Sequence, residues 1–327
     1  MSLVSIVVPL YNEVENVEAL YTEIKQVADN NSINCEFVFV DDGSADGTAA
    51  RLLEVAGEDP RLVIVNFRRN FGQTAAMAAG IDYAQGDVIV TMDGDLQNDP
   101  AEIPRMLEKL NEGYDMVAGW RKHRQDKFVS RKLPSLIANR IISKTTNVKL
   151  HDYGCTLKAI RSEVAKNIKL YGEMHRFIPA LAAEMGVKIA EIPVNHRPRI
   201  HGTSKYGISR TIRVLLDLLT VKFFLGFSTR PLHMFGPLGL VSSGIGTLIL
   251  MFLAYERLIL GISIGTRPIL LLAFVLVLVG LQFLCFGLLA EVLVRTYHAS
   301  QDKKTYAVRS VSRGGENKPP EKITRAI

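Results

Sequence analysis

The sequence predicts an α/β protein with a doubly wound, mainly parallel sheet, followed by an interfacial amphipathic helix and two transmembrane helices. Apolar runs at 4–9, 35–42, 61–67 and 87–95 alternate with helical patterns at 14–29, 48–56 and 74–84. Strands that alternate with helices in this way are typical of parallel sheets covered on both faces. Beyond residue 231 the composition changes to long apolar segments.

Two apolar segments, 232–255 and 268–290, contain no Asp, Glu, Lys or Arg. Each reaches the ~20 residues that a helix needs to cross a bilayer. Two crossings return the chain to its starting side, and the excess of Lys and Arg after residue 294 predicts that this side is the cytoplasm. A buried helix pair of a soluble protein is the alternative.

The segment before the first apolar run, 207–227, places Arg210, Arg213, Asp217 and Thr220 on one helical face and apolar residues on much of the other. This pattern favours a helix at the membrane surface over an ordinary core-facing helix. The predicted domains are therefore an α/β domain at 1–206, a juxtamembrane helix at 207–230, a two-helix hairpin at 231–294 and a basic cytoplasmic tail at 295–327. The three cysteines are far apart and match no zinc or redox spacing.

Polar clusters follow three of the predicted strands: "PLYNE", "DDGSADGT" and "DGDLQ". Ligands of open α/β sheets bind at the carboxyl ends of the strands, so these clusters are expected to converge. Asp93 and Asp95 would point to the same side of an extended chain, and their like charges need a cation. Neither the Gly-rich turn of dinucleotide-binding proteins nor a P-loop is present. A divalent cation, Mg²⁺ or Mn²⁺, shared by carboxylate and diphosphate oxygens satisfies this pattern.

Four segments, "VVPLYNEVENV", "FVDDGSADGT", "RRNFGQTAAMAAGIDYAQGDVIVTMDGDLQNDPAEIP" and "HDYGCTLKAI", resemble the inverting family-2 glycosyltransferases of the GT-A fold. Within this family the chain is similar to the polyisoprenyl-phosphate glycosyltransferases, which include bactoprenol glucosyltransferases, dolichol-phosphate mannose synthases and 4-deoxy-4-formamido-L-arabinose transferases. The resemblance extends over residues 3–230. It implies an inner-membrane enzyme that transfers a sugar from a nucleotide diphosphate to polyisoprenyl (undecaprenyl) phosphate on the cytoplasmic face, making a lipid-linked sugar for cell-envelope polysaccharide.

The resemblance also assigns roles on the donor side. Asp42 is expected to bond the base or ribose, Asp93 the ribose, Asp95 the metal, and Gln97 the metal or phosphate. For Asp42 an ordinary turn is the alternative, and Asp99 before Pro100 is expected to cap a helix. The base and ribose pocket is expected to be lined by Pro9, Tyr11 and Glu13, with a half-buried aromatic as the alternative for Tyr11.

The acceptor side is basic. By resemblance, the lipid phosphate is contacted by Arg121, Arg131, Ser135, Arg199 and Lys205. Arg124, Lys132 and His201 belong equally to a basic face that attracts anionic lipid. Nucleic acid is not expected as a partner, because two membrane spans argue against it.

The general base is left open, because a phosphomonoester with a second pKa of ~6 is already largely dianionic. Asp152 is expected to act either as this base or as a group that orients the acceptor or Arg side chains. The expected catalytic residues are thus Asp95, Asp152, Arg121 and Lys205.

Two other functions compete with this one. A processive polysaccharide synthase needs a Q-x-x-R-W segment, and the single tryptophan, Trp120, lies in "AGWRK" instead. A non-catalytic membrane scaffold that retained the fold is a second competitor. UDP-glucose is the first expected donor, followed by UDP-4-deoxy-4-formamido-L-arabinose and GDP-mannose. A homo-oligomer is expected through the surface helix or through the small residues Gly236, Gly239, Gly244 and Gly246.

Overall fold

The computed structural model describes residues 2–57, 59–122, 150–170, 174–198, 232–265, 267–300 and 305–314. The chain forms two compact units, one from residues 1–218 and 304–327 and the other from residues 219–303. The juxtamembrane helix predicted at 207–230 lies outside the described residues.

The first unit is built on the doubly wound, mainly parallel sheet that the sequence predicts. In its described part, eight strands lie in the order β7-β5-β6-β4-β1-β2-β3-β8. Strands β4, β1, β2 and β3 run parallel, as do β5 and β7, whereas β6 and β8 are antiparallel to their neighbours. The strands are β1 (Val4–Leu10), β2 (Cys35–Asp41), β3 (Leu62–Phe67), β4 (Val88–Thr91), β5 (Met116–Trp120), β6 (Lys158–Arg161), β7 (Ile189–Pro193) and β8 (Val308–Arg313).

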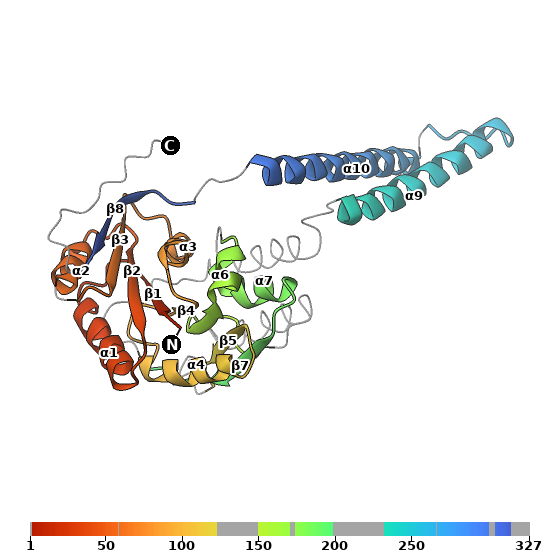
Figure 1. Ribbon diagram of the computed structural model, residues 1–327. Coiled ribbons are helices and arrows are strands. Elements are labelled where there is room, and N and C mark those ends of the chain that lie inside the picture. The colour runs from red at the N-terminus through yellow and green to blue at the C-terminus, as the bar shows by residue number, and fades with distance from the viewer. Residues whose placement is uncertain are drawn as a thin grey trace. The chain divides into compact units, whose positions relative to one another are not determined.

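Helices cover both faces of this sheet (Figure 1). On one face, Leu20 and Ile24 of α1 pack with Ile6 and Val8 of β1 in a common core. On the other, Gly80 of α3 lies directly against Val7 and Val40, which explains why all residues of β1 and β2 are buried. The helices are α1 (Val17–Asn30), α2 (Thr48–Ala56), α3 (Gln73–Tyr83), η1 (Pro100–Glu102), α4 (Ile103–Asn111), α6 (Ser162–Asn167), η3 (Met174–Phe177) and α7 (Ile178–Glu184).

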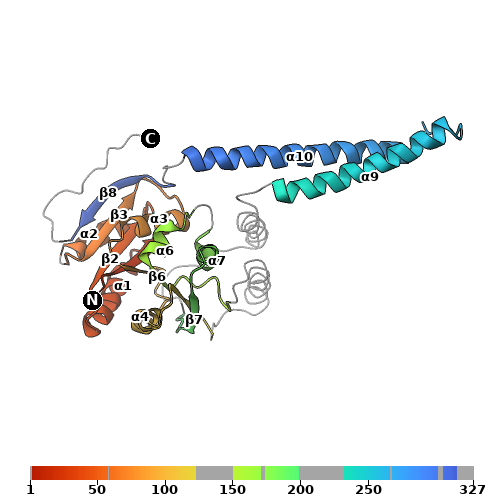
Figure 2. The ribbon, with the colours of Figure 1, turned by 45° about the vertical axis from the view of Figure 1, so that its right-hand side comes forward.

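The segment after the second apolar helix returns to the sheet. Strand β8 pairs antiparallel with β3, with Val63 opposite Arg313 and Phe67 opposite Val308, and Figure 2 shows the two strands side by side. The sequence pattern predicts no strand in this segment. Its alternation of small polar and apolar residues is short, and its partner strand lies more than two hundred residues earlier in the chain.

The second unit is a pair of long helices, α9 (Leu232–Leu258) and α10 (Pro268–Ser300). Within them Met234–Leu258 and Pro268–Ala290 are long and apolar enough to cross a membrane. Of the most apolar 18 residues in each, only 17% and 11% are buried inside the protein. Large side chains such as Leu248 and Leu271 are exposed, which is unlike the core helices of a soluble domain.

Small residues bring α9 and α10 close together. A Cβ atom added at Gly280 of α10 would lie 2.6 Å from the carbonyl oxygen of Gly239, and one at Gly246 would lie 2.7 Å from that of Ala273. Such close approach is characteristic of helix packing in membranes. A Cβ atom added at Gly244 would have no neighbour within 4 Å, so Gly244 does not pack against α10. Oligomerisation through these glycines stays a prediction.

Candidate active site

The three predicted polar clusters lie at the carboxyl ends of adjacent strands. Register pairs Leu10 of β1 with Asp41 of β2, so the loops that follow these strands are neighbours. The Asn12 backbone N–H donates to Ser44 Oγ at 2.9 Å, and the Ala45 N–H donates to Asn12 Oδ1 at 2.9 Å. Asn12 adopts a φ of 52°, a left-handed conformation that asparagine tolerates better than most residues. The first two loops are thus joined by reciprocal hydrogen bonds.

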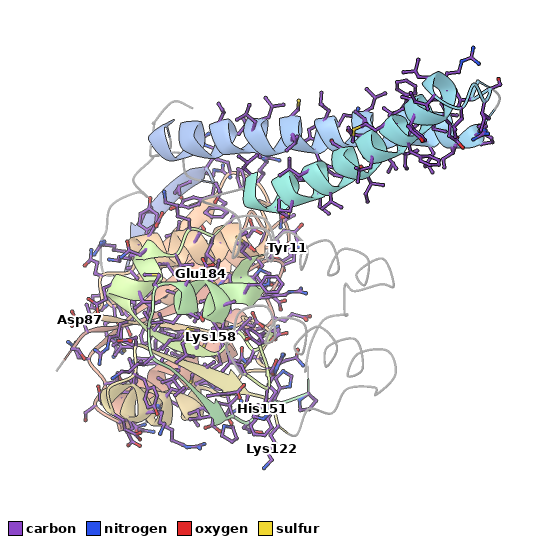
Figure 3. The ribbon with its side chains drawn as sticks, turned by 90° about the vertical axis from the view of Figure 1, so that its right-hand side faces the viewer. Tyr11, Asp87, Lys122, His151, Lys158 and Glu184 are labelled. Carbon is purple, nitrogen blue, oxygen red and sulfur yellow. The ribbon has the colours of Figure 1, made fainter. Side chains whose placement is uncertain are left out.

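Of the residues expected around the base and ribose, Pro9 is buried within β1 and Tyr11 is 38% exposed at the end of that strand. Asp87 directly precedes β4. Figure 3 shows Tyr11 and Asp87 on opposite sides of the unit. The Glu13 carboxylate accepts a hydrogen bond from Asn16 Nδ2 at 2.5 Å. Their contact with a nucleotide stays a prediction.

Asp42 is buried and holds the loop that follows β3. Its carboxylate accepts hydrogen bonds from the backbone N–H groups of Phe71, at 2.7 Å, and Gly72, at 2.9 Å. Burial raises the pKa of Asp42, and these two hydrogen bonds oppose the rise. Each carboxylate oxygen retains a further lone pair with which to accept from a ligand. Asp42 therefore fixes a loop and can still serve the expected nucleotide contact.

Asp93 occupies the end of β4 with both oxygens engaged. Gln73 Nε2 donates to Oδ1 at 2.7 Å and Thr156 Oγ1 donates to Oδ2 at 2.7 Å. Burial and the neighbouring Asp95 carboxylate raise the pKa of Asp93. No local pattern in the sequence points to Gln73 or Thr156, because only tertiary folding brings "FGQT" and "GCTL" to this strand end.

The turn after Asp93 is backbone-strained. Leu96 has a φ of 61°, which is unfavourable for a residue with a Cβ, and its side chain is only 3% exposed. Burial of Leu96 anchors this turn, and the Gln97 N–H donates to Asp95 Oδ1 at 3.2 Å. The conformation therefore keeps Asp95 and Gln97 together, as the predicted metal site requires.

A second contact supports this turn from the segment after β7. The Arg197 N–H donates to the Gln97 carbonyl at 2.9 Å, and its guanidinium pairs with Asp99 at 2.7 Å and Glu23 at 2.7 Å. Asp99 also accepts from the Ala101 N–H and so caps η1, which confirms the expected cap. The Arg197 guanidinium is therefore bound to two acidic side chains.

Arg121 and Asp152, both expected near the acceptor from the sequence, form a bidentate ion pair. Their atoms approach to 2.6 Å (Nε to Oδ2) and 2.9 Å (Nη2 to Oδ1), and both side chains are almost buried. Burial would lower the pKa of Arg121, but Asp152 raises it above its usual value. Glu191 of β7 accepts the backbone N–H groups of His151 and Asp152, at 2.9 Å each to Oε1, and so fixes the loop that carries Asp152.

A buried lysine lies within electrostatic reach of Asp152 and Asp93. Lys158 of β6 is 1% exposed and donates to the Cys155 carbonyl. Burial lowers the pKa of Lys158, whereas burial raises that of the Cys155 thiol. The predicted residues Arg131, Ser135, Arg199 and Lys205, with Arg124, Lys132 and His201, lie outside the described residues.

The donor set suits a metal that binds through few protein ligands. Among the described residues, no group of three or more His, Cys, Asp or Glu side chains is arranged to hold a metal. Mg²⁺ in nucleotide enzymes is commonly bound by one or two carboxylates, substrate phosphates and water. Asp95, with Gln97 beside it, matches that pattern of oxygen ligands.

The doubly wound sheet, with an Asp-x-Asp turn after β4, agrees with the GT-A-type fold expected from the sequence. The sequence matches the family described as "Glycosyl transferase family 2" over residues 5–169. The chain belongs to this family.

Two curated relatives extend over nearly the whole chain. A dodecaprenyl-phosphate galacturonate synthase from Rhizobium johnstonii is 48% identical over 94% of this chain and 92% of the relative. An undecaprenyl-phosphate 4-deoxy-4-formamido-L-arabinose transferase from Aeromonas hydrophila is 38% identical over 96% of this chain and 95% of the relative.

Solved structures of lower identity share the fold. Mannosyl-3-phosphoglycerate synthase from Rubrobacter xylanophilus matches with a TM-score of 0.54 at 16% identity, over 68% of this chain and 74% of that one. Glucosyl-3-phosphoglycerate synthase from Mycobacterium tuberculosis, in complex with Mn²⁺, UDP and phosphoglyceric acid, matches with a TM-score of 0.53 at 18% identity, over 69% and 79% of the two chains. The GT-A-type fold expected from the sequence is confirmed.

Proposed function

We propose that this family-2 glycosyltransferase moves a sugar from a nucleoside diphosphate to a polyprenyl phosphate at the cytoplasmic face of a membrane. The observation that carries the proposal is the carboxylate pair Asp93 and Asp95 in the turn after β4, with Asp95 only 9% exposed, in a chain that also has two exposed apolar helices. Relatives whose names include dodecaprenyl and undecaprenyl phosphate align over almost the entire chain, hairpin included, which supports the lipid acceptor.

The reaction is an in-line displacement at the anomeric carbon. An oxygen of the acceptor phosphate forms the new bond to that carbon, the bond to the donor diphosphate breaks with its electron pair, and the configuration inverts. A divalent cation held by Asp95 and Gln97 would neutralise charge on the departing diphosphate. The acceptor brings its own negative charge, so the protein has mainly to position the reactants.

The acidic and basic residues divide this work. Asp42 and Asp93 orient the nucleoside, while Arg121 offers a guanidinium near the acceptor side and Asp152 holds it in place. The bidentate pair supports an orienting role for Asp152, because both of its carboxylate oxygens are already engaged by Arg121. Lys205 and the other predicted phosphate ligands remain part of this proposal.

The identity of the transferred sugar is proposed from the relatives. Glucose from UDP-glucose was the first expectation from the two-span architecture. Greater identity to the galacturonate synthase than to the formamidoarabinose transferases makes galacturonate the first sugar to test. UDP is the proposed nucleotide for each of these donors, with GDP-mannose as the comparison.

The connectivity of the sheet supports the proposed membrane topology. Strand β7 precedes the hairpin and β8 follows it, and both belong to one sheet. A chain that leaves a folded domain and returns to it must cross the bilayer an even number of times, which supports two spans with both ends on one side. The basic tail supports the cytoplasm as that side.

The test is transfer of labelled sugar to undecaprenyl phosphate by the full-length protein in detergent with Mg²⁺ or Mn²⁺. UDP-galacturonate, UDP-glucose, UDP-formamidoarabinose and GDP-mannose are compared, with Asp95→Asn as the blank. A lipid-linked sugar formed from one donor and absent with the variant supports the proposal and names the donor. Metal-dependent UDP binding without transfer from any donor would instead favour the non-catalytic scaffold.

A further inference from the structure

Strand β8 brings the chain that follows the membrane hairpin to the donor side of the sheet. Because β8 is antiparallel to β3, its first residues lie at the carboxyl end of β3, where the active-site loops begin. The Arg68 N–H donates to the Ala307 carbonyl at 3.1 Å, so pairing continues into the loop that follows β3. The Gly314 N–H donates to the Leu62 carbonyl at 2.8 Å at the other end.

Tyr306, just before β8, connects two elements of the donor half. Its ring stacks on Phe67, the last residue of β3, with 5.1 Å between centroids and 14° between planes. Its hydroxyl donates to Asp82 Oδ2 of α3 at 2.6 Å. With only 9% of its surface exposed, Tyr306 fills the space between the end of β3 and the side of α3.

The loop that Tyr306 braces is the one that Asp42 holds. Phe71 packs edge-on against Phe67 with ring centroids 5.6 Å apart, while the Phe71 N–H bonds to Asp42. On the opposite side, a Cβ atom at Gly43 would lie 2.3 Å from the Arg69 carbonyl carbon. Residues 68–72 are therefore packed between Asp42 and Gly43 on one side and Phe67 with Tyr306 on the other.

The same loop leads directly to the second donor-side carboxylate. Gln73, the first residue of α3, donates to Asp93 at 2.7 Å, and Tyr306 bonds to Asp82 on that helix. A movement of Phe67 or α3 would therefore displace hydrogen bonds at both Asp42 and Asp93. Tyr306 touches the elements on either side of this loop.

We propose that Tyr306 is a positioning residue for the nucleotide site, through which the segment after the membrane hairpin sets the loop between Asp42 and Asp93. The inference rests on the proposed function, since it takes the nucleoside diphosphate to bind at these carboxylates. Tyr306 itself does not touch the donor. It acts through its stack on Phe67 and its hydrogen bond to Asp82.

The experiment measures UDP binding with Mn²⁺ by calorimetry, and donor KM and kcat, on the full-length enzyme. Tyr306→Ala removes both contacts, whereas Tyr306→Phe keeps the stack and Asp82→Asn weakens the hydrogen bond. Tyr306→Ala is expected to raise the UDP Kd and donor KM about 5- to 30-fold, the factor for one or two lost interactions of ordinary strength. Tyr306→Phe gives a smaller rise. Arg309→Ala, at an exposed position of the same strand, stays within about twofold of the unmodified enzyme.

A merely structural role would lower the melting temperature and leave UDP binding by the folded protein unchanged. That result with Tyr306→Ala overturns the inference. Should Tyr306→Ala fail to fold, unchanged UDP affinity in both Tyr306→Phe and Asp82→Asn overturns it equally. If the unmodified enzyme does not bind UDP, the proposed donor class fails and this inference with it. If UDP binds but no sugar is transferred, the failure lies in the proposed reaction, and the variants still decide the role of Tyr306.

Discussion

Arg121 at the end of β5 and Asp152 in the loop before β6 meet through two parallel hydrogen bonds of 2.6 and 2.9 Å. Asp152 Oδ1 also accepts from the Gly154 N–H at 3.1 Å. Both carboxylate oxygens are therefore occupied by the guanidinium and the loop backbone. The pair is therefore better suited to orienting a guanidinium than to taking a proton.

This geometry predicts the effect of changing either partner. Asp152→Asn should lower kcat about 100-fold through misplacement of Arg121, and Arg121→Lys should act similarly because lysine lacks the bidentate fork. The acid limb of the pH–rate profile should persist in Asp152→Asn, since it then belongs to the acceptor phosphate with its second pKa of ~6. Transfer rates measured between pH 5 and 9 check this. A profile that loses its acid limb in the variant would identify Asp152 as the base instead.

The metal site predicts a dependence on divalent cations. EDTA should abolish transfer and added Mn²⁺ or Mg²⁺ should restore it, while Asp95→Asn should cost at least about 100-fold in kcat because a metal supplies several kcal/mol of charge stabilisation. Asp87→Asn is the matched control, since Asp87 is an exposed aspartate before the same strand and Figure 3 places it on the opposite side of the unit from Tyr11 and His151. Full activity in EDTA, or equal losses in the two variants, would contradict the assigned metal ligand.

Gly43 and Gly47 both have left-handed backbones, but only Gly43 is also closely packed, so substitutions at the two positions distinguish backbone strain from steric overlap. Gly43 has a φ of 69° and its missing Cβ would lie 2.3 to 2.7 Å from the Arg69 and Asn70 backbone, whereas Gly47 has a φ of 99° and no neighbour closer than 3.9 Å. Gly47→Ala should lower the free energy of unfolding by only ~1–2 kcal/mol, the cost of a left-handed conformation for a residue with a Cβ. Gly43→Ala should lose more and should weaken UDP binding, because it displaces the loop that bonds to Asp42. Thermal unfolding and UDP calorimetry distinguish the two. Equal losses of stability and equal UDP affinity in the two variants would show that the loop at Arg69 and Asn70 shifts without cost to make room for the added methyl group.

The sequence predicts the first four strands well because they are continuous apolar runs, and it predicts their polar ends because parallel strands bring those ends together. Strand β6 begins with Lys158 and β8 reads VRSVSR, so neither has the apolar pattern that identifies a strand. Their place depends on partners distant in the chain.

The same distinction holds in the site. Asp93 and Asp95 stand out because two carboxylates follow a buried strand. Gln73, Thr156 and Glu191 carry no such local signal, and they become partners of Asp93 and of the Asp152 loop only when α3, β6 and β7 assemble. The hairpin was predictable from composition alone, but which glycines face the partner helix was not.

The contact between α9 and α10 predicts which of those glycines matter. Gly280→Val should destabilise the hairpin, because a Cβ there would meet Ser243 and the Gly239 carbonyl at 2.6 Å or less, and forced overpacking costs about 1–3 kcal/mol. Gly244→Val adds the same side chain to α9 where no atom lies within 4 Å, so it should leave the hairpin intact. Melting of the detergent-solubilised full-length protein, followed by light scattering, measures the difference. If Gly244→Val is the more damaging of the two, its face packs against another protein surface, such as a second copy of the chain, and the hairpin contact is not the main support.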